Sequence, residues 1–358
     1  MLAKSEVLIN ALLINTSLLV YWWAYNSRDD IAGFKMGHEA ILLLAAEDMA
    51  EVNEIILAQL SSDVSLVNGL GSYLIGGRGK RLRPLLVLLS AKALGYTGTK
   101  HTVAAAFVEF IHTATLLHDD VVDESDFRRG KKTANKAFGN AASILVGDYI
   151  YTRSFQMMTQ LGSLRVLELM SETVNVIAEG EVRQLANCNN PDVTEASYMR
   201  IVRSKTAKLF AAAAQVSAIL SNAPADIERT LKRYGRHVGT AFQLIDDVMD
   251  YTSNIQSMGK KVGDDLSKGK ITLPLLHALR NGTSKQSTLI RDAISSMRGM
   301  DYLDEILSIL EKTGSIGYAK KKAEEESEKA VLALSLLPDN VYKSALEALA
   351  RLAVARTK

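Results

Sequence analysis

Two short aspartate runs carry the most specific chemical signal in this sequence of 358 residues. Residues four apart lie on one face of a helix, so each run presents two carboxylates together and a third about 100° away. Such a cluster repels itself unless cations offset it, and hard oxygen ligands favour Mg²⁺ or Ca²⁺. Two facing runs with metal ions between them would hold a diphosphate. The runs are Asp119, Asp120 and Asp123, and Asp246, Asp247 and Asp250.

A single aspartate cluster is more often a solvated helix end than a site. Here each run follows a strongly apolar stretch, Leu116-Leu117 in one case and Leu244-Ile245 in the other, which a solvated end does not need. His112 lies two helical turns before Asp119, so the two side chains are nearly aligned. A lone histidine is usually a core residue, but this alignment makes a functional role an equal alternative.

Basic residues gather at three further points. Gly79-Lys80-Arg81-Leu82-Arg83-Pro84 is a basic turn that leads into a helix, where amides at the N-terminus favour anions. Arg128-Arg129-Gly130 and Lys205-Thr206 repeat the theme, and the planar fork of arginine suits phosphate oxygens. Each alone could be a solvated loop. Together they predict two anionic sites, one reached through metal ions and one held directly by Lys and Arg.

Helices must position these groups, because the pattern predicts little else. The chain is 47% hydrophobic, holds only 5 prolines and is rich in Ala and Leu, the residues that favour helices. Breaks fall at the turn clusters 95–98, 187–192 and 221–224, and Thr194 with Glu195 can begin a helix. We predict an all-α fold: a single large bundle of roughly ten or more helices around a central cavity. The clearest apolar stripe comprises Val103, Phe107, Phe110, Ile111, Ala114 and Leu117.

Bulk composition excludes some partners. The net charge is +2 and no long Lys/Arg block occurs, so nucleic acid is not an expected partner. The single cysteine, Cys188, cannot form an internal disulfide, which favours a reducing compartment such as the cytoplasm. Residues 7–23 are largely apolar, but polar residues interrupt them, so the pattern does not favour a membrane anchor there. We divide the chain into an N-terminal extension, 1–35, with Met36 as an alternative start, and one domain, 36–358.

In this order the motifs resemble those of the trans-isoprenyl diphosphate synthases, the polyprenyl diphosphate synthase family. The resemblance covers residues from about 46 to the C-terminus and includes Phe242-Gln243 and the run 259–266. The stretch 110–158 most resembles the bacterial octaprenyl diphosphate synthases, which make the precursor of the ubiquinone side chain. Residues 1–35 have no counterpart in the pattern.

The resemblance implies the isoprenoid synthase fold and a Mg²⁺-dependent prenyltransferase. The enzyme would add isopentenyl diphosphate to an allylic diphosphate, farnesyl diphosphate being the expected starter and octaprenyl diphosphate the expected product. Isopentenyl diphosphate would be held by Lys80, Arg83, His112 and Arg129. The allylic diphosphate would be held by Arg128, Lys205, Thr206, Gln243, Lys260 and Lys270. Two to three Mg²⁺ ions would be held by Asp119, Asp120, Asp123, Asp246 and Asp250. The catalytic set would be these aspartates with Asp247 and Lys205.

Assembly and location also follow from the resemblance. It implies a homodimer and a product that partitions into membranes. The enzyme would be cytoplasmic, and association with a membrane through its product or through the apolar N-terminal segment is left open.

Product length is expected to depend on a tunnel below Asp119. Ala114 and Thr115, one turn earlier, are small, whereas short-chain relatives typically carry an aromatic residue there. Phe155, Met158 and Met170 are candidates for the tunnel floor, although methionines in helices usually fill cores.

Other readings compete. A class I terpene cyclase shares the fold and one aspartate run, but its second motif usually mixes Asn, Ser and Glu. A synthase of another chain length is a closer alternative. A phosphohydrolase would need more histidines than the 6 present. A di-iron bundle would need the Glu109-x-x-His112 motif twice. A non-catalytic subunit would be expected to lose aspartates.

Overall fold

The computed structural model describes residues 36–75, 79–128, 130–252 and 262–355. Within these ranges the chain is almost entirely helical and holds more than ten helices, which confirms the prediction of an all-α fold with roughly ten or more helices. The extension 1–35 lies outside the described residues. The helices are α2 (His38–Leu44), α3 (Ala46–Leu60), α4 (Ser65–Ile75), α5 (Leu82–Ala93), α6 (Lys100–Val122), α7 (Ala134–Phe138), α8 (Asn140–Gln160), α9 (Leu164–Ala186), α10 (Glu195–Ile201), the π-helix η1 (Val202–Ala207), α11 (Lys208–Leu220), α12 (Ala225–Thr252), α14 (Asp264–Ser267), α15 (Leu273–Asn281), α16 (Ser284–Ser295), the 3-10 helix η2 (Gly299–Tyr302), α17 (Leu303–Lys312), α18 (Ser315–Ala333), the 3-10 helix η3 (Leu334–Leu336) and α19 (Val341–Val354).

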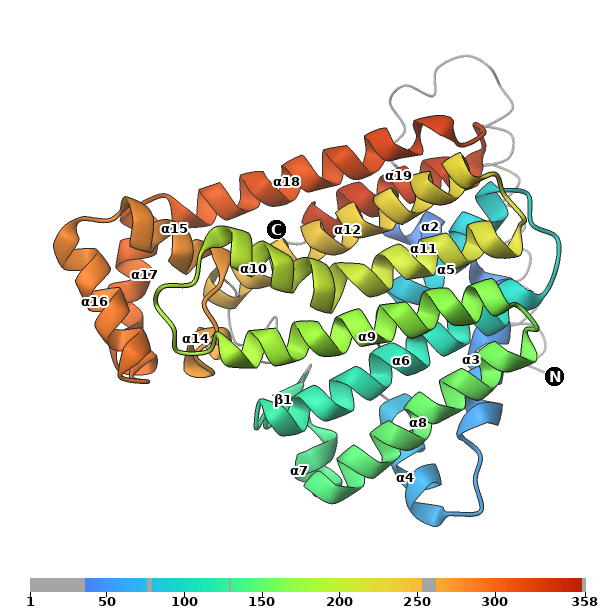
Figure 1. Cartoon of the computed structure of the whole chain (residues 1–358), viewed down its shortest axis with the longest axis horizontal. Coiled ribbons are helices and arrows are strands. Elements are labelled where there is room, and N and C mark those ends of the chain that lie inside the picture. Colours follow the sequence, from blue (N-terminus) through green and yellow to red (C-terminus); the bar gives the residue numbers. More distant parts are fainter. Residues whose placement is uncertain (1–35, 76–78, 129, 253–261, 356–358) are drawn as a thin grey trace, which may run out of the picture.

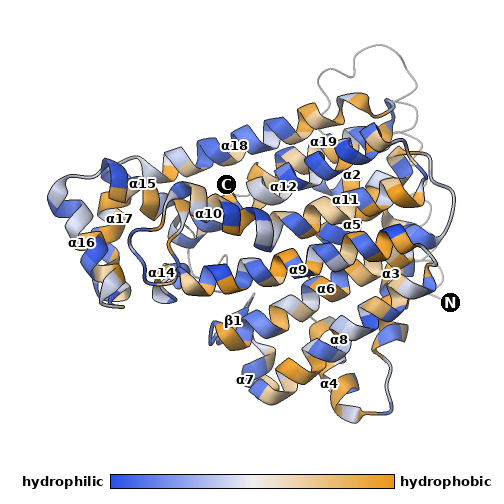
Figure 2. Ribbon diagram, viewed as in Figure 1, coloured by the Kyte–Doolittle hydropathy of each residue, from blue (hydrophilic) through white to orange (hydrophobic). Residues whose placement is uncertain are grey.

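The long helices α6, α8, α9, α11, α12 and α18 lie side by side and form a bundle, with the short helices α14 to α17 grouped at one end (Figure 1). Bands of hydrophobic residues alternate with hydrophilic ones along the long helices (Figure 2). This is the pattern of helices that bury one face and solvate the other. No described helix is long and apolar enough to cross a membrane.

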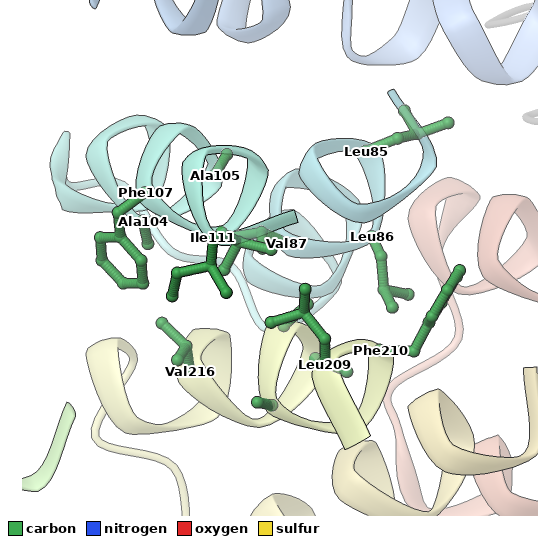
Figure 3. Packing of buried hydrophobic residues seen from close by; sticks show 14 of the residues in the cluster. Leu85, Leu86, Val87, Ala104, Ala105, Phe107, Ile111, Leu209, Phe210 and Val216 are labelled. Atoms are coloured by element: carbon green, nitrogen blue, oxygen red, sulfur yellow. The ribbon is translucent and has the colours of Figure 1, made fainter. Parts of the chain in front are cut away.

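The apolar stripe predicted for the 100–122 region forms the inner face of α6. Phe107, Ile111 and Ala114 are fully buried. Residues of α6 face Val87 of α5 and Val216 of α11 across the middle of the bundle (Figure 3). Burying each large aliphatic or aromatic side chain of this kind contributes about 1.5–3 kcal/mol. The helix that ends in the first aspartate run is therefore fixed by the core.

Helix α12 belongs to both hydrophobic cores of the described chain. Its N-terminal half contributes Leu231 and Tyr234 to the large core. Its C-terminal half contributes Leu244, Ile245 and Val248 to a second core formed with α15 to α18. The second aspartate run, which lies at this C-terminal end, is thus held between the bundle and the short helices.

Two glycines let α12 approach its neighbours closely. A Cβ at Gly235 would lie 2.3 Å from the carbonyl oxygen of Phe210, and one at Gly239 would lie 2.7 Å from Cα of Ala207. Real Cβ atoms do not approach backbone this closely, so only glycine fits. The backbone of α12 therefore packs directly on α11 and η1.

Local signals explain several boundaries. The side chain of Thr194 accepts a hydrogen bond from Ser197 N at 3.2 Å, so α10 begins at Glu195 as expected.

The sequence pattern predicts no strand, yet β1 (Phe127–Arg128) and β2 (Lys131–Lys132) pair antiparallel. Two-residue strands leave no alternation to detect. Gly130 at the turn has φ 76°, a conformation that glycine adopts without strain.

Candidate active site

Asp119 and Asp123 lie one turn apart where α6 ends. The amide of Asp123 donates to the carbonyl of Asp119 at 2.8 Å, which closes that turn. Both side chains are half-buried and line a cavity of about 170 Å³. Residues from α9, α10, η1, α12 and the segment 265–272 complete its wall. The same-face prediction for these two carboxylates fits this arrangement.

Asp120, the middle aspartate, faces elsewhere. It is buried, and its Oδ1 lies 2.7 Å from Nη2 and 3.1 Å from Nε of Arg128. Burial opposes the charge of Arg128, but the carboxylate of Asp120 outweighs it and raises the pKa of the guanidinium. Asp120 lines a neighbouring cavity of about 390 Å³. Its assignment as a metal ligand stays a prediction, and its observed contact is with Arg128.

The second run supplies a buried hydrogen-bonded carboxylate. Asp247 is 2% exposed, and its Oδ2 accepts a hydrogen bond from the hydroxyl of Tyr198. Its Oδ1 accepts from Nε2 of Gln243 at 2.8 Å, while Oε1 of Gln243 accepts from Thr206 at 2.8 Å. Burial, with the charge of Asp265, raises the pKa of Asp247 to about 8. Asp247 lines the 170 Å³ cavity, as Asp119 does, so both runs reach one space.

Asp250 ties the segment after α12 to the site. Its Oδ2 accepts from the amide of Asp265 at 3.2 Å, and its carbonyl accepts from the amide of Gly263 at 2.9 Å. This segment brings Nζ of Lys270 to 2.5 Å from Oδ2 of Asp123. Asp246 is half-buried on the same helix.

Asp123 and Lys270 each shift the pKa of the other. Burial alone would lower the pKa of Lys270, but Asp265 and Asp123 raise it above its usual value. Burial alone would raise the pKa of Asp123, but Lys270 lowers it below its usual value. Both groups are therefore ionised at neutral pH.

Lys205, on η1, lines the cavity. Its Nζ lies 2.5 Å from Oε2 of Glu181, 2.8 Å from Oε1 of Gln184 and 3.5 Å from Oδ2 of Asp119. Burial, together with Asp119, raises the pKa of Glu181. Single π-helical turns are common at functional sites because they change the direction in which side chains project.

Mg²⁺ is compatible with these residues. Among the described residues, no three His, Cys, Asp or Glu side chains converge closely enough to hold an ion by themselves. Mg²⁺ usually takes one or two carboxylates and fills its octahedron with water and substrate phosphate. Asp119 and Asp123, adjacent on the cavity wall, supply that kind of donor set.

The residues predicted for isopentenyl diphosphate are not gathered around one described cavity. His112 lines the 390 Å³ cavity, whereas Lys80, at the start of α5, lines a third cavity of about 150 Å³. The guanidinium carbon of Arg83 lies 4.5 Å from the ring centroid of Phe210. Arg129, like Lys260 of the allylic set, lies outside the described residues. The isopentenyl site remains a prediction.

The candidate chain-length residues lie in or beside the core. Ala114, Met158 and Met170 are fully buried, and Thr115 and Phe155 are half-buried. The hydroxyl of Thr115 donates to the carbonyl of His112 at 2.8 Å. None of the five lines the three cavities described here. Their role in product length stays a prediction.

Sequence reasoning missed several residues of the cavity wall. Gln184 lines the cavity, and Glu181, three residues earlier on α9, pairs with Lys205 behind it, so their position on one helical face was a usable signal. Tyr198 precedes Lys205 by two turns, but nothing local marks it as a partner of Asp247. Asp265 lies within the run 259–266, and the sequence alone gives it no role.

Comparison with known proteins adds independent information. The family model for polyprenyl synthetase matches residues 64–310. Octaprenyl diphosphate synthase of Escherichia coli (strain K12) is 58% identical over 323 residues, covering 90% of this chain and 100% of that protein. The Haemophilus influenzae octaprenyl diphosphate synthase is 54% identical over 321 residues, covering 90% and 98%.

Solved structures of polyprenyl synthases have the same fold as this chain. A decaprenyl diphosphate synthase from Rhodobacter capsulatus superposes with a TM-score of 0.85 at 41% identity, covering 90% of this chain and 100% of that one. A polyprenyl synthase from Caulobacter crescentus, complexed with calcium and isoprenyl diphosphate, gives 0.87 at 38% identity, covering 91% and 99%.

Proposed function

The chain belongs to the polyprenyl synthetase family, and from that membership we propose that it makes octaprenyl diphosphate as a long-chain trans-prenyltransferase. It adds isopentenyl diphosphate units to an allylic diphosphate, with farnesyl diphosphate as the starter. The observation that carries the proposal is the 170 Å³ cavity, which Asp119, Asp123 and Asp247 line together with Lys205 and Lys270. Supply of the ubiquinone side chain is part of the proposal and follows from the product.

The allylic diphosphate binds in this cavity. Asp119 and Asp123, with Asp246 on α12, would hold the two to three Mg²⁺ ions. When bound, Mg²⁺ supplies positive charge that offsets the developing charge of the diphosphate. Asp120 and Asp250 remain in the proposed ligand set, and in this structure they also contact Arg128 and the amide of Asp265 respectively.

Ionisation of the C–O bond of the allylic diphosphate is the demanding step. Lys205, Lys270 and Arg128 line the cavity and are positioned to bind the departing diphosphate. Fixed cations aimed at a developing charge act strongly because they need no rearrangement during the reaction. The carbon–carbon double bond of isopentenyl diphosphate attacks the allylic carbon, and the proton then lost passes to the released diphosphate.

The family resemblance assigns isopentenyl diphosphate to Lys80, Arg83, His112 and Arg129, and we propose that it binds at the neighbouring 390 Å³ cavity, which His112 lines. The growing chain extends along α6 past Ala114 and Thr115, toward Phe155, Met158 and Met170. Small residues beside the first aspartate run are what a long product needs.

A homodimer is part of the proposal. Exposed apolar side chains occur on α6, α8 and α9, which lie side by side: Val122 is 63% exposed, Leu145 64% and Val182 68%. A contiguous exposed apolar patch marks a subunit interface, and we propose that these residues contribute to one. We place the enzyme in the cytoplasm, associated with membranes through its product.

Mass spectrometry of the product tests the function. The chain, Mg²⁺, farnesyl diphosphate and isopentenyl diphosphate should together give octaprenyl diphosphate. A product of another length would correct the chain length only. A cyclic hydrocarbon without uptake of isopentenyl diphosphate would replace the proposal with a terpene cyclase.

A further inference from the structure

The hydroxyl of Tyr198 begins a chain of hydrogen bonds beside the cavity, which we call the circuit. It runs through Asp247 and Gln243 to Thr206, and the segment 198–206 closes it. Tyr198 donates to Asp247, and Asp247 also accepts from Gln243. Gln243 in turn accepts from Thr206, which lies eight residues after Tyr198 on the same chain segment. The circuit therefore joins α10 and η1 to α12 at two points.

Lys205 lies inside this circuit. It precedes Thr206 directly and follows Tyr198 by seven residues, so both tethers flank it. A π-helical turn is wider and less well bonded than an α-helical one. The close packing of η1 on α12 at Gly239 limits how η1 can move away, and the tethers limit how it can rotate.

Both oxygens of Asp247 are occupied by protein donors, and the side chain is 2% exposed. Asp247 therefore serves as an anchor in this structure. Tyr198 is itself only 5% exposed, so water cannot readily replace its hydroxyl.

We infer that Tyr198 is a positioning residue. Through its hydrogen bond to Asp247 it holds the π-helical turn in the orientation in which Lys205 and Thr206 bind the departing diphosphate. The inference rests on the proposed function. Although Tyr198 also lines the cavity, the inference assigns its hydroxyl to Asp247 and not to the substrate, and it predicts an effect on the ionisation step.

Tyr198→Phe tests this, because it removes one oxygen and keeps the ring. Loss of a residue that hydrogen-bonds to a metal ligand typically lowers activity by about 10- to 100-fold, and we take this range as the guide for Tyr198. We expect kcat for elongation of farnesyl diphosphate to fall by that factor, while KM for isopentenyl diphosphate stays that of the parent chain. Activities are compared at a temperature at which thermal unfolding curves show every variant folded.

Tyr234→Phe is the matched control. Tyr234 is also fully buried, and its hydroxyl donates to the carbonyl of Leu346 at 2.6 Å, away from the cavity. It should lower the melting temperature without lowering kcat. Equal loss of kcat in both variants would reduce Tyr198 to a structural role and overturn the inference.

A double-mutant cycle with Lys205→Ala measures the coupling between Tyr198 and Lys205 in kcat. A general loss of stability would not produce such coupling. If Tyr198 acts through Lys205, Tyr198→Phe should have little further effect once Lys205 is truncated. Additive losses, or an unchanged kcat in Tyr198→Phe alone, would overturn the inference while the parent chain still elongates. A parent chain that does not elongate would overturn the proposed function and this inference with it.

Discussion

Nζ of Lys270 lies 2.5 Å from Oδ2 of Asp123, although the two residues are 147 positions apart in the chain. Lys205 stands in a similar relation to Asp119, at 3.5 Å. Each carboxylate of the first run that lines the cavity thus faces an ammonium group. These pairs offset the repulsion between neighbouring carboxylates that the sequence alone would predict.

Asp119→Ala should lower turnover at saturating Mg²⁺ by at least about 100-fold, since removing even an outer-shell partner of a metal site costs 10- to 100-fold. Initial-rate assays with farnesyl and isopentenyl diphosphates measure this. Asp339→Ala is the control, because the side chain of Asp339 is 93% exposed and paired only with Lys343 in the described chain. Turnover close to that of the parent chain in Asp119→Ala would refute the metal assignment.

Ala114→Phe should shorten the product while the enzyme stays active. Ala114 is fully buried, so the larger ring will also destabilise the fold by about 1–3 kcal/mol. Ala330→Phe, at a fully buried position of α18, controls for that strain and should leave the product length unchanged. Mass spectrometry of both products decides, and an unchanged product in Ala114→Phe would remove Ala114 from the tunnel.

Gly239→Ala should destabilise the fold by about 1–3 kcal/mol and lower turnover, because its Cβ would meet Cα of Ala207 in η1 at 2.7 Å. Gly317→Ala is the control: nothing lies within 4 Å of that Cβ, and alanine in a helix should stabilise by about 0.5–1 kcal/mol. Denaturant unfolding and initial rates measure both effects. Equal stability of the two variants would mean that α12 and η1 separate easily.

Glu326→Gln should remove part of the acid sensitivity of folding. Burial opposes ionisation of Glu326, but Nδ1 of His237, 2.6 Å away, and Lys329 lower its pKa from 4.5 to about 2. A lowered pKa gives stability that is present above the unfolded value and lost as pH falls from about 4.5 to about 2. That difference corresponds to about 3 kcal/mol.

Urea unfolding at a series of pH values measures this loss. The parent chain should lose stability more steeply below pH 4.5 than Glu326→Gln does. Glu325→Gln, which removes an ion pair with Lys322 that is far more exposed, should follow the parent. Parallel curves for all three chains would show that the His237 contact contributes nothing.

The helical fold could be predicted because its signals are local. The stripe from Val103 to Leu117 marks the buried face of α6, and Thr194 marks the start of α10. The hairpin at 127–132 could not be predicted, because strands of two residues carry no periodicity. The sequence predicts only in part which aspartates line the cavity. Helical geometry shows that Asp120 points in a different direction from Asp119. It does not show that Arg128 binds Asp120, or that Tyr198 binds Asp247, because packing between helices brings those partners together.

The π-helical turn at Val202–Ala207 has a consequence for register. A π turn holds one residue more than an α turn, so removing a single residue before Lys205 would restore ordinary winding from α10 into α11. The helices on either side, α10 and α11, would keep nearly their present directions, because the extra residue lies within the turn itself. Only the residues of the turn, Lys205 among them, would change the direction in which they project, so a one-residue deletion here should lower turnover more than it lowers stability.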